Sequence, residues 1–199
     1  MSPTHQSLKK LVLASRSETR LSLLKTAYIY PDIIDPADID ESIFNNSPHS
    51  EVALLLAIEK GQKVASKYAD AIILSADTVV IAGSKMLDKA HNDEDVAQYI
   101  NLMSDNLITI YSGVSVISVS GGKIIYSNSA NSQSKIAFKK ISQWEKNKYL
   151  ASKEGIGVAG GLKIEGYASS FVKHINGSMT GIMGLPLYET IELLSHAKL

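Results

Sequence analysis

The chain has 199 residues, of which 45% are hydrophobic; twenty Lys and Arg balance twenty Asp and Glu, and there is no cysteine. The length predicts one globular domain, residues 1–199. The balanced charge gives no overall field that favours nucleic acid or an anionic membrane surface. Without cysteine there are no disulfides, thiolate metal sites or thiol nucleophiles, a usage typical of the reducing cytoplasm where we expect this protein.

The apolar runs of the chain are short. The longest, residues 52–58, is well below the roughly 18 residues that cross a bilayer. The apolar stretch after Lys9 and Lys10 covers residues 11–14 and is too short for the core of a signal peptide. We therefore expect a soluble protein that is not exported by that route.

The first half of the chain alternates apolar strands with helices. Residues 11–14 predict a buried strand, and a tight loop then leads into apolar residues at helical spacing between 21 and 27. A second helix is predicted over about 50–68. The buried strand 71–74 follows, ending in the polar segment 75–78 before another apolar run.

The second half adds an antiparallel hairpin. Asn92 and the acidic residues after it predict a helix start. Residues 107–137 alternate around a Gly-Gly turn, as expected for a long hairpin. Ser142 and Glu145 form a capping-box pattern for the next helix. Residues 169–175 predict a strand, and Pro186 opens a final helix through Leu194. The pattern indicates a mixed α/β fold.

Two segments carry residues suited to phosphate chemistry. Between Ser15 and Arg20 a buried strand meets a helix N-terminus, where free N–H groups favour an anion and Arg20 adds a bidentate donor. Asp77 stands where an apolar strand ends, and its carboxylate suits a metal ion or the deprotonation of water. Each has a structural alternative: Ser17 caps the helix with Arg20 in solvent, and Asp77 fixes a turn.

The glycine-rich segment 155–160 has the spacing of a dinucleotide-binding motif. A helix precedes it and no acidic residue stands about twenty positions later, so we reject that interpretation. Lys163 and Glu165 follow the glycines, and a loop with a cation and a carboxylate could close over a nucleotide. The alternative is a mobile surface connection.

Four motifs occur in chain order: LVLASRSETRLSLL at 11–24, SADTVV at 75–80, SGVSV at 112–116 and GSMTGIMGLPLYETIELL at 177–194. Together they resemble the Maf family of nucleoside triphosphate pyrophosphatases. The resemblance implies a mixed twisted sheet with flanking helices and a deep cleft between two lobes, often in a homodimer. The implied reaction hydrolyses a nucleoside triphosphate to its monophosphate and pyrophosphate with a divalent cation, Mg²⁺ or Mn²⁺, in the house-cleaning of nucleotide pools.

The resemblance also assigns residues to the triphosphate. Carried over by position, Ser15 and Arg20 would hold the phosphates, and Lys60 and Lys89 would neutralise the triphosphate tail. Cations in those places would stabilise the departing pyrophosphate.

Two carboxylates complete the implied site. Asp77 would be the catalytic carboxylate, and Asp77 with Glu41 would hold the metal. Attack of water at the α-phosphorus needs a base or a metal ion on the side opposite the leaving group. Whether Asp77 removes the proton itself or positions water on the metal stays open.

Three positions bear on the nucleotide base. Thr19 matches neither the pyrimidine (dTTP/UTP) branch nor the 7-methyl-GTP branch of the family, and Glu18 before it replaces a proline. Glu165, within LKIEG at 162–166, resembles the 7-methyl-GTP branch, and a carboxylate suits a guanine edge or a methylated, cationic base. Thr78 matches the pyrimidine branch. The balance favours a purine or modified purine.

A non-catalytic nucleotide-binding regulator of cell division or septation is the alternative to an enzyme. Asp77, Lys60, Lys89 and Arg20 together favour catalysis, because a binding protein needs no carboxylate among its cations. A phosphomonoesterase, which would release orthophosphate, is a minor third alternative.

Overall fold

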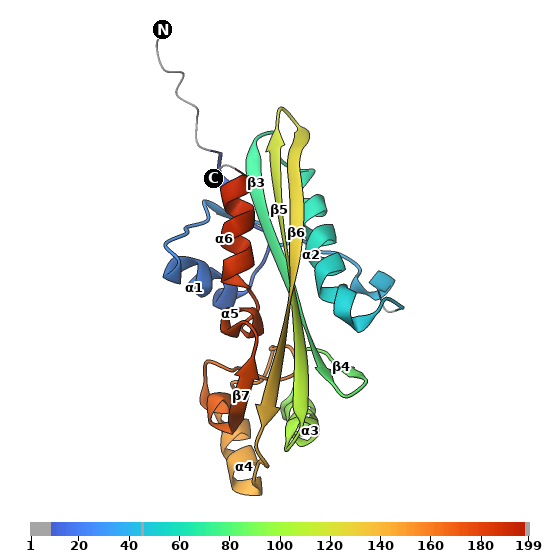
Figure 1. Cartoon of the computed structure of the whole chain (residues 1–199), viewed down its shortest axis with the longest axis vertical. Helices are drawn as coiled ribbons and strands as arrows, with labels where there is room; N and C mark the ends of the chain where they lie inside the picture. Colours follow the sequence, from blue (N-terminus) through green and yellow to red (C-terminus); the bar gives the residue numbers. More distant parts are fainter. Residues whose placement is uncertain (1–8, 45, 198–199) are drawn as a thin grey trace.

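A computed structural model describes residues 9–44 and 46–197 (Figure 1). Seven strands form one mixed sheet in the order β2–β1–β3–β5–β6–β7, with β4 paired to β3 outside this path. The strands are β1 (Leu11–Leu13), β2 (Ile33–Ile34), β3 (Ala71–Ala82), β4 (Lys85–Leu87), β5 (Leu107–Ser120), β6 (Lys123–Phe138) and β7 (Val172–Asn176). The helices are α1 (Glu18–Thr26), α2 (His49–Ala65), α3 (Asp93–Met103), α4 (Gln143–Ser152), α5 (Met179–Ile182), α6 (Leu187–His196) and the 3₁₀ helices η1 (Glu41–Phe44) and η2 (Tyr167–Phe171).

Three long strands, β3, β5 and β6, run the length of the molecule and connect two groups of helices (Figure 1). β5 pairs antiparallel with all twelve residues of β3, whereas β1 pairs with β3 in parallel. The predicted hairpin is confirmed: β5 and β6 turn at Gly121 and Gly122, which both have positive φ angles that glycine adopts without strain. The expected mixed sheet is confirmed as well.

The core is divided by the sheet. Successive residues of β3 point to opposite faces, so Leu74 packs with Leu24 of α1 and Leu194 of α6, while Ile73 packs with Val64 of α2. These helices and the sheet between them form the first lobe, in which α6 covers one face of the sheet and α2 covers the other (Figure 1). A separate cluster, which includes the buried residues of α3 and α4, forms the core of the second lobe.

Several predicted helix starts are confirmed by hydrogen bonds. The Ser17 side chain accepts from the Arg20 amide at the start of α1, and the Asn92 side chain accepts from the Asp95 amide at the start of α3. Ser142 forms the predicted capping box at the start of α4. Capping side chains accept hydrogen bonds from amide groups that have no partner within the helix. Only a few residue types can do this, so these helix starts could be predicted from the sequence.

Some predicted boundaries are wrong. The second helix ends at Ala65 rather than near 68, and the residues before Val172 form the 3₁₀ helix η2 instead of a strand. Pro186 opens α6 as its N-cap residue, as predicted, but the helix continues to His196 rather than ending at Leu194. The short helix α5 had no periodic apolar signal, since it spans only four residues.

The largest correction concerns residues 71–82, which form one continuous strand, β3, with Asp77 in its middle. The polar residues stay in the strand because β5 pairs with them throughout and Ser75, fully buried, donates to the Ala57 carbonyl oxygen at 2.6 Å. The strand that does end here is β1, which pairs only with Ile72 to Leu74 of β3. Asp77 thus lies beside the carboxyl end of β1 rather than beyond the end of its own strand.

Tyr149 fixes the glycine-rich loop that follows α4. The ring is buried, and the hydroxyl donates to the Gly161 carbonyl oxygen at 2.9 Å and accepts from the Lys163 amide at 3.0 Å. Burial raises the pKa of Tyr149 to about 12, so the hydroxyl remains a donor at neutral pH.

We expect Tyr149→Phe to lower the free energy of unfolding by about 1–3 kcal/mol, because it leaves a backbone carbonyl and an amide without their buried partner. Urea unfolding at neutral pH measures the loss. Tyr188→Phe is the control, since the Tyr188 side chain is exposed and its hydroxyl can bond to water. Equal unfolding free energies for Tyr149→Phe and wild type would contradict this role.

Candidate active site

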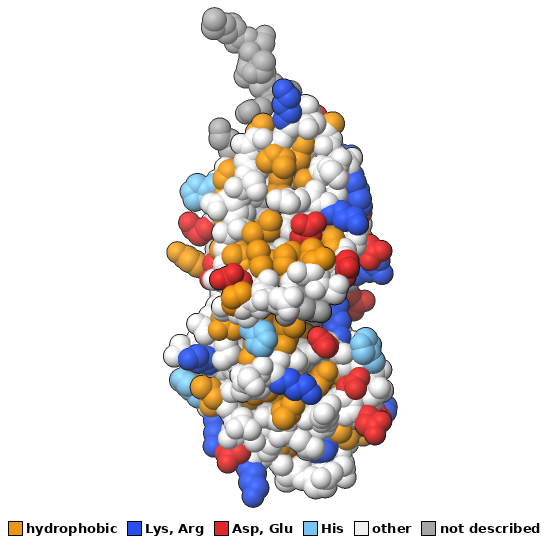
Figure 2. Space-filling model, turned by 90° about the vertical axis from the view of Figure 1, so that its right-hand side faces the viewer, with side chains coloured by type: hydrophobic (Ala, Val, Ile, Leu, Met, Phe, Trp, Pro, Cys, Tyr) orange, Lys and Arg blue, Asp and Glu red, His pale blue; other side chains and the backbone are white. Residues whose placement is uncertain are grey.

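A cleft of about 1200 Å³ separates the two lobes. The molecular surface narrows at this level, about halfway along the molecule (Figure 2). The cleft lies along the edge of β3 between two neighbours: β1 pairs up to Leu74, and β4 pairs from Val80 onward. All nine site positions predicted from the sequence line it: Ser15, Thr19, Arg20, Glu41, Lys60, Asp77, Thr78, Lys89 and Glu165.

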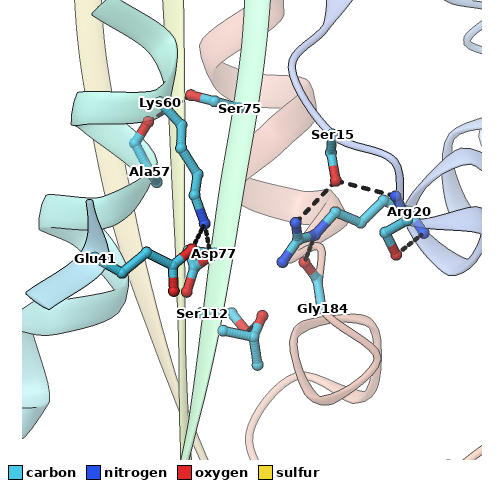
Figure 3. A network of polar contacts seen from close by, with 11 residues as sticks. Ser15, Arg20, Glu41, Ala57, Lys60, Ser75, Asp77, Ser112 and Gly184 are labelled. Carbon is cyan, nitrogen blue, oxygen red and sulfur yellow. Dashed lines mark hydrogen bonds and ion pairs between the residues drawn. The ribbon is translucent and has the colours of Figure 1, made fainter. Parts of the chain in front are cut away.

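Lys60 of α2 connects two carboxylates. Its Nζ lies 2.5 Å from Asp77 Oδ1 and 2.7 Å from Glu41 Oε1 (Figure 3). The side chains of Lys60 and Asp77 are each 13% exposed, whereas that of Glu41, on η1, is 56% exposed. A charge pair with so little solvent is held by mutual attraction, since either partner alone would be costly to bury. The cation predicted for the triphosphate therefore lies against both carboxylates predicted for the metal.

Ser15 and Arg20 form a second polar group after β1 (Figure 3). Arg20 Nη1 donates to Ser15 Oγ at 3.0 Å, and Nε donates to the Gly184 carbonyl oxygen at 2.9 Å. Ser15 Oγ also accepts from the Ser17 amide at 3.2 Å. With two bonds accepted, the Ser15 hydroxyl keeps its proton for donation to a ligand. Arg20 is therefore not a solvated surface residue. Two of its guanidinium N–H groups already donate within the protein, and the remaining ones are left for a ligand.

The positive charge of Arg20 interacts with the negative charges of Asp77 and Glu41. Burial lowers the pKa of the Arg20 guanidinium, and the charges of Asp77 and Glu41 oppose that change. Arginine stays charged at neutral pH even so. This part of the cleft thus brings the cations Lys60 and Arg20 together with the carboxylates of Asp77 and Glu41.

The Thr78 side chain points to the face of β3 opposite to that of Asp77. There a chain of hydrogen-bonded hydroxyl groups determines whether Thr78 donates or accepts. Ser112 Oγ donates to the Gly181 carbonyl oxygen at 2.6 Å, which uses its one proton. Thr78 Oγ1, 2.8 Å from Ser112 Oγ, must then donate to it. Thr78 can offer only lone pairs to a ligand, whereas Ser15 offers a proton.

The glycine-rich loop is hydrogen-bonded through its backbone to the segment that carries Lys89. The Gly157 amide donates to the Ala90 carbonyl oxygen at 2.7 Å, and the Gly160 amide donates to that of Asp88 at 2.9 Å. Exposed Lys89 lies on this partner segment, bridged to Ala159. These bonds place Lys89 and the loop on one wall of the cleft.

Two residues predicted to contact the base touch each other across the cleft. Thr19 Oγ1, on α1, donates to Glu165 Oε1 at 3.2 Å. Both ends of this contact are solvent-accessible, so it is weak. It joins α1 to the segment after the glycine-rich loop.

The acidic residues fit a metal that arrives with a phosphorylated ligand. Within residues 9–44 and 46–197, no group of three or more His, Asp or Glu residues could hold a metal ion. Asp77 and Glu41 do converge on one cation, the Lys60 ammonium. Mg²⁺ is commonly held by one or two carboxylates together with phosphate oxygens and water. The donor set therefore suits Mg²⁺ shared with a ligand better than a metal site made by protein alone.

Three further residues of the site, Ser112, Gly181 and Gly184, were not singled out from the sequence, although all three lie in the SGVSV and GIMGLP segments that carried the resemblance. Two of them act through backbone carbonyl groups, as acceptors for Ser112 and Arg20. A residue that acts through its backbone carbonyl cannot be recognised from the chemistry of its side chain in a single sequence.

The fold and the cleft define an α/β protein whose central cleft gathers cations and carboxylates at the edge of a mixed sheet. The family model described as Maf-like protein matches residues 10–197, and the chain belongs to this family. Among the described residues, no helix is both long and apolar enough to cross a membrane.

Curated relatives match over nearly the whole chain. A nucleoside triphosphate pyrophosphatase from Orientia tsutsugamushi is 38% identical over 187 residues, covering 94% of this chain and 91% of the relative. A dTTP/UTP pyrophosphatase from Mesorhizobium japonicum is 41% identical over 194 residues, with the same coverage. Among solved structures, a HAM1 protein from Coxiella burnetii aligns with a TM-score of 0.43 at 15% identity, over 65% of this chain and 73% of that one.

We expect Ser112→Ala to lower the free energy of unfolding by about 1–3 kcal/mol, because the buried Gly181 carbonyl loses its donor. Chemical denaturation measures the loss against Ser127→Ala, whose hydroxyl is exposed on the neighbouring strand. If both variants unfold with the wild-type free energy, the hydroxyl chain does not hold α5 against β5.

Proposed function

We propose that this protein hydrolyses a nucleoside triphosphate to the nucleoside monophosphate and pyrophosphate. The observation that carries the proposal is the Lys60–Asp77 pair in the same cleft as Ser15 and Arg20. A carboxylate, two cations and a hydroxyl donor are the groups that attack on a phosphoanhydride requires. The names of the two curated relatives support the same reaction class.

In the proposed reaction Asp77 accepts the proton of a water molecule that attacks the α-phosphorus. The bond from the α-phosphorus to its bridging oxygen breaks, and pyrophosphate leaves with the electron pair. Ser15, Arg20 and Lys89 bind phosphate oxygens, and Lys60 orients Asp77 and offsets the negative charge that develops. Asp77 and Glu41 would hold Mg²⁺ or Mn²⁺, which supplies further charge neutralisation on the phosphates.

The residues predicted to bear on the nucleotide base are acceptors. Glu165 is a carboxylate, and Thr78 offers lone pairs only. Acceptors select bases that present N–H donors, and the two donors on the guanine edge suit a carboxylate. Guanine-type nucleotides are therefore the first substrate class we propose. The dTTP/UTP pyrophosphatase among the relatives makes those pyrimidine nucleotides the second.

We expect Asp77→Asn to lower kcat by at least about a hundredfold, the loss typical of removing a general base. The measurement is release of pyrophosphate and orthophosphate from standard, deoxy and methylated nucleoside triphosphates with Mg²⁺ or Mn²⁺. Asp105→Asn is the matched control, because Asp105 is exposed and lies outside the cleft.

The outcomes of this assay separate the alternatives. Pyrophosphate release that requires Asp77 supports the proposal. Nucleotide binding without turnover would favour the non-catalytic regulator of septation, and release of orthophosphate alone would favour a phosphomonoesterase. Near-normal turnover by Asp77→Asn would exclude the proposed mechanism.

We expect Glu165→Gln to shift preference away from guanine-type bases, because an amide presents one acceptor oxygen where the carboxylate presents two. Relative kcat/KM for GTP, 7-methyl-GTP, UTP and dTTP measures the shift. Glu94→Gln, an exposed change on α3, serves as control. Unchanged ratios across the four nucleotides would reject a role for Glu165 in base selection.

A further inference from the structure

The backbone of α2 lies directly on the sheet at the level of Asp77. Gly113 of β5 is paired with Asp77 in the β3–β5 ladder. A Cβ atom on Gly113 would lie 2.5 Å from Leu54 Cα and closer still to the Ala53 carbonyl oxygen, both backbone atoms of α2. Non-bonded carbon atoms pack at about 3.5–4.0 Å, so only glycine permits this approach.

A second close approach lies next to Lys60. A Cβ atom on Gly61 of α2 would lie 2.7 Å from the Ser75 Oγ atom. That hydroxyl is buried and donates to the Ala57 carbonyl oxygen, one turn earlier on the same helix (Figure 3). Ser75 is two residues before Asp77 in β3, so both side chains point to the face that α2 covers.

We propose that Gly113, Gly61 and Ser75 are positioning residues that set the distance between α2 and the sheet, and thereby hold Lys60 against Asp77. The inference rests on the proposed function for its catalytic consequence. Gly61 follows Lys60 in α2 and Gly113 is paired with Asp77 in the sheet, and the atoms nearest to their Cβ positions do not belong to Ser15 or Arg20.

The geometry makes Lys60 sensitive to the position of its helix. A side chain on Gly113 meets backbone, so α2 must move outward by about 1 Å to restore normal contact distances. η1 packs on α2 and carries Glu41, so Lys60 and Glu41 would move together while Asp77 stays in β3. A displacement of about 1 Å in a catalytic group can cost about a hundredfold in rate.

The experiment is a double-mutant cycle with Gly61→Ala, Ser75→Ala and the double variant. Gly61→Ala places its new methyl group against Ser75 Oγ, so either α2 moves outward or the hydroxyl turns away from the Ala57 carbonyl and releases the helix. We expect kcat to fall at least about tenfold in protein that is fully folded by circular dichroism. Ser75→Ala removes the obstructing oxygen. The next neighbours are the Ile117 and Ser115 side chains, 3.3 and 3.5 Å from the Cβ position. The double variant should therefore return to within about threefold of Ser75→Ala.

Val64→Ala is the matched control for stability. Val64 is fully buried on the same helix, one turn beyond Gly61, so its truncation lowers Tm without pushing α2 from the sheet. We expect a lower Tm with unchanged kcat at a temperature where the protein is folded. A purely structural role would instead make activity follow Tm in every variant, Val64→Ala included, and that result would overturn the proposal.

Crystal structures of Gly61→Ala and of the double variant test the positioning separately from catalysis. We expect the distance from Lys60 Nζ to Asp77 Oδ1 to lengthen beyond 4 Å in Gly61→Ala and to return in the double variant. If wild type releases no pyrophosphate but the distances change as expected, the proposed function fails and the positioning role stands. If the distance is the same in all of them, the positioning role is wrong whatever the activity.

Discussion

The contact between Lys60 and Asp77 joins a helix to the central strand of the sheet inside a cleft. Each side chain is only 13% exposed, so each charge depends on the other, and breaking such a pair leaves a charge that is costly to bury. The contact also places Glu41, through the same ammonium group, at the mouth of the cleft. The arrangement of carboxylates and cations therefore depends on how closely α2 lies on the sheet, which two positions without side chains permit.

The cleft owes its position to strand lengths. β1 stops after three residues and β4 begins six residues further along β3, so the edge of β3 between Leu74 and Val80 has no paired strand among the described residues. A ligand bound at that edge would meet side chains from both faces of the sheet, with Lys60 and Asp77 on one face and Thr78 with Arg20 near Gly184 on the other. The hydroxyl groups along this edge also differ in what they offer a ligand, because Ser15 can donate a hydrogen bond and Thr78 can only accept one.

Much of the fold was predictable because local signals agreed with it. Capping residues marked α1, α3 and α4, and alternation around Gly121 marked the hairpin. The error at residues 75–78 arose because polar residues usually end a strand, whereas here Ser75 bonds to α2 and β5 continues the ladder. The nine site positions came from motifs, and all line the cleft. Their mutual contacts were not predictable, since Lys60 with Glu41 and Thr19 with Glu165 depend on side-chain directions across separate elements.

Hydrolysis in water enriched in ¹⁸O tests the central claim most directly. If water attacks the α-phosphorus, as we propose, one label appears in the nucleoside monophosphate and none in pyrophosphate. Mass spectrometry of both products from a single turnover gives the answer. Label in pyrophosphate with unlabelled monophosphate would place the attack at the β-phosphorus and contradict the account.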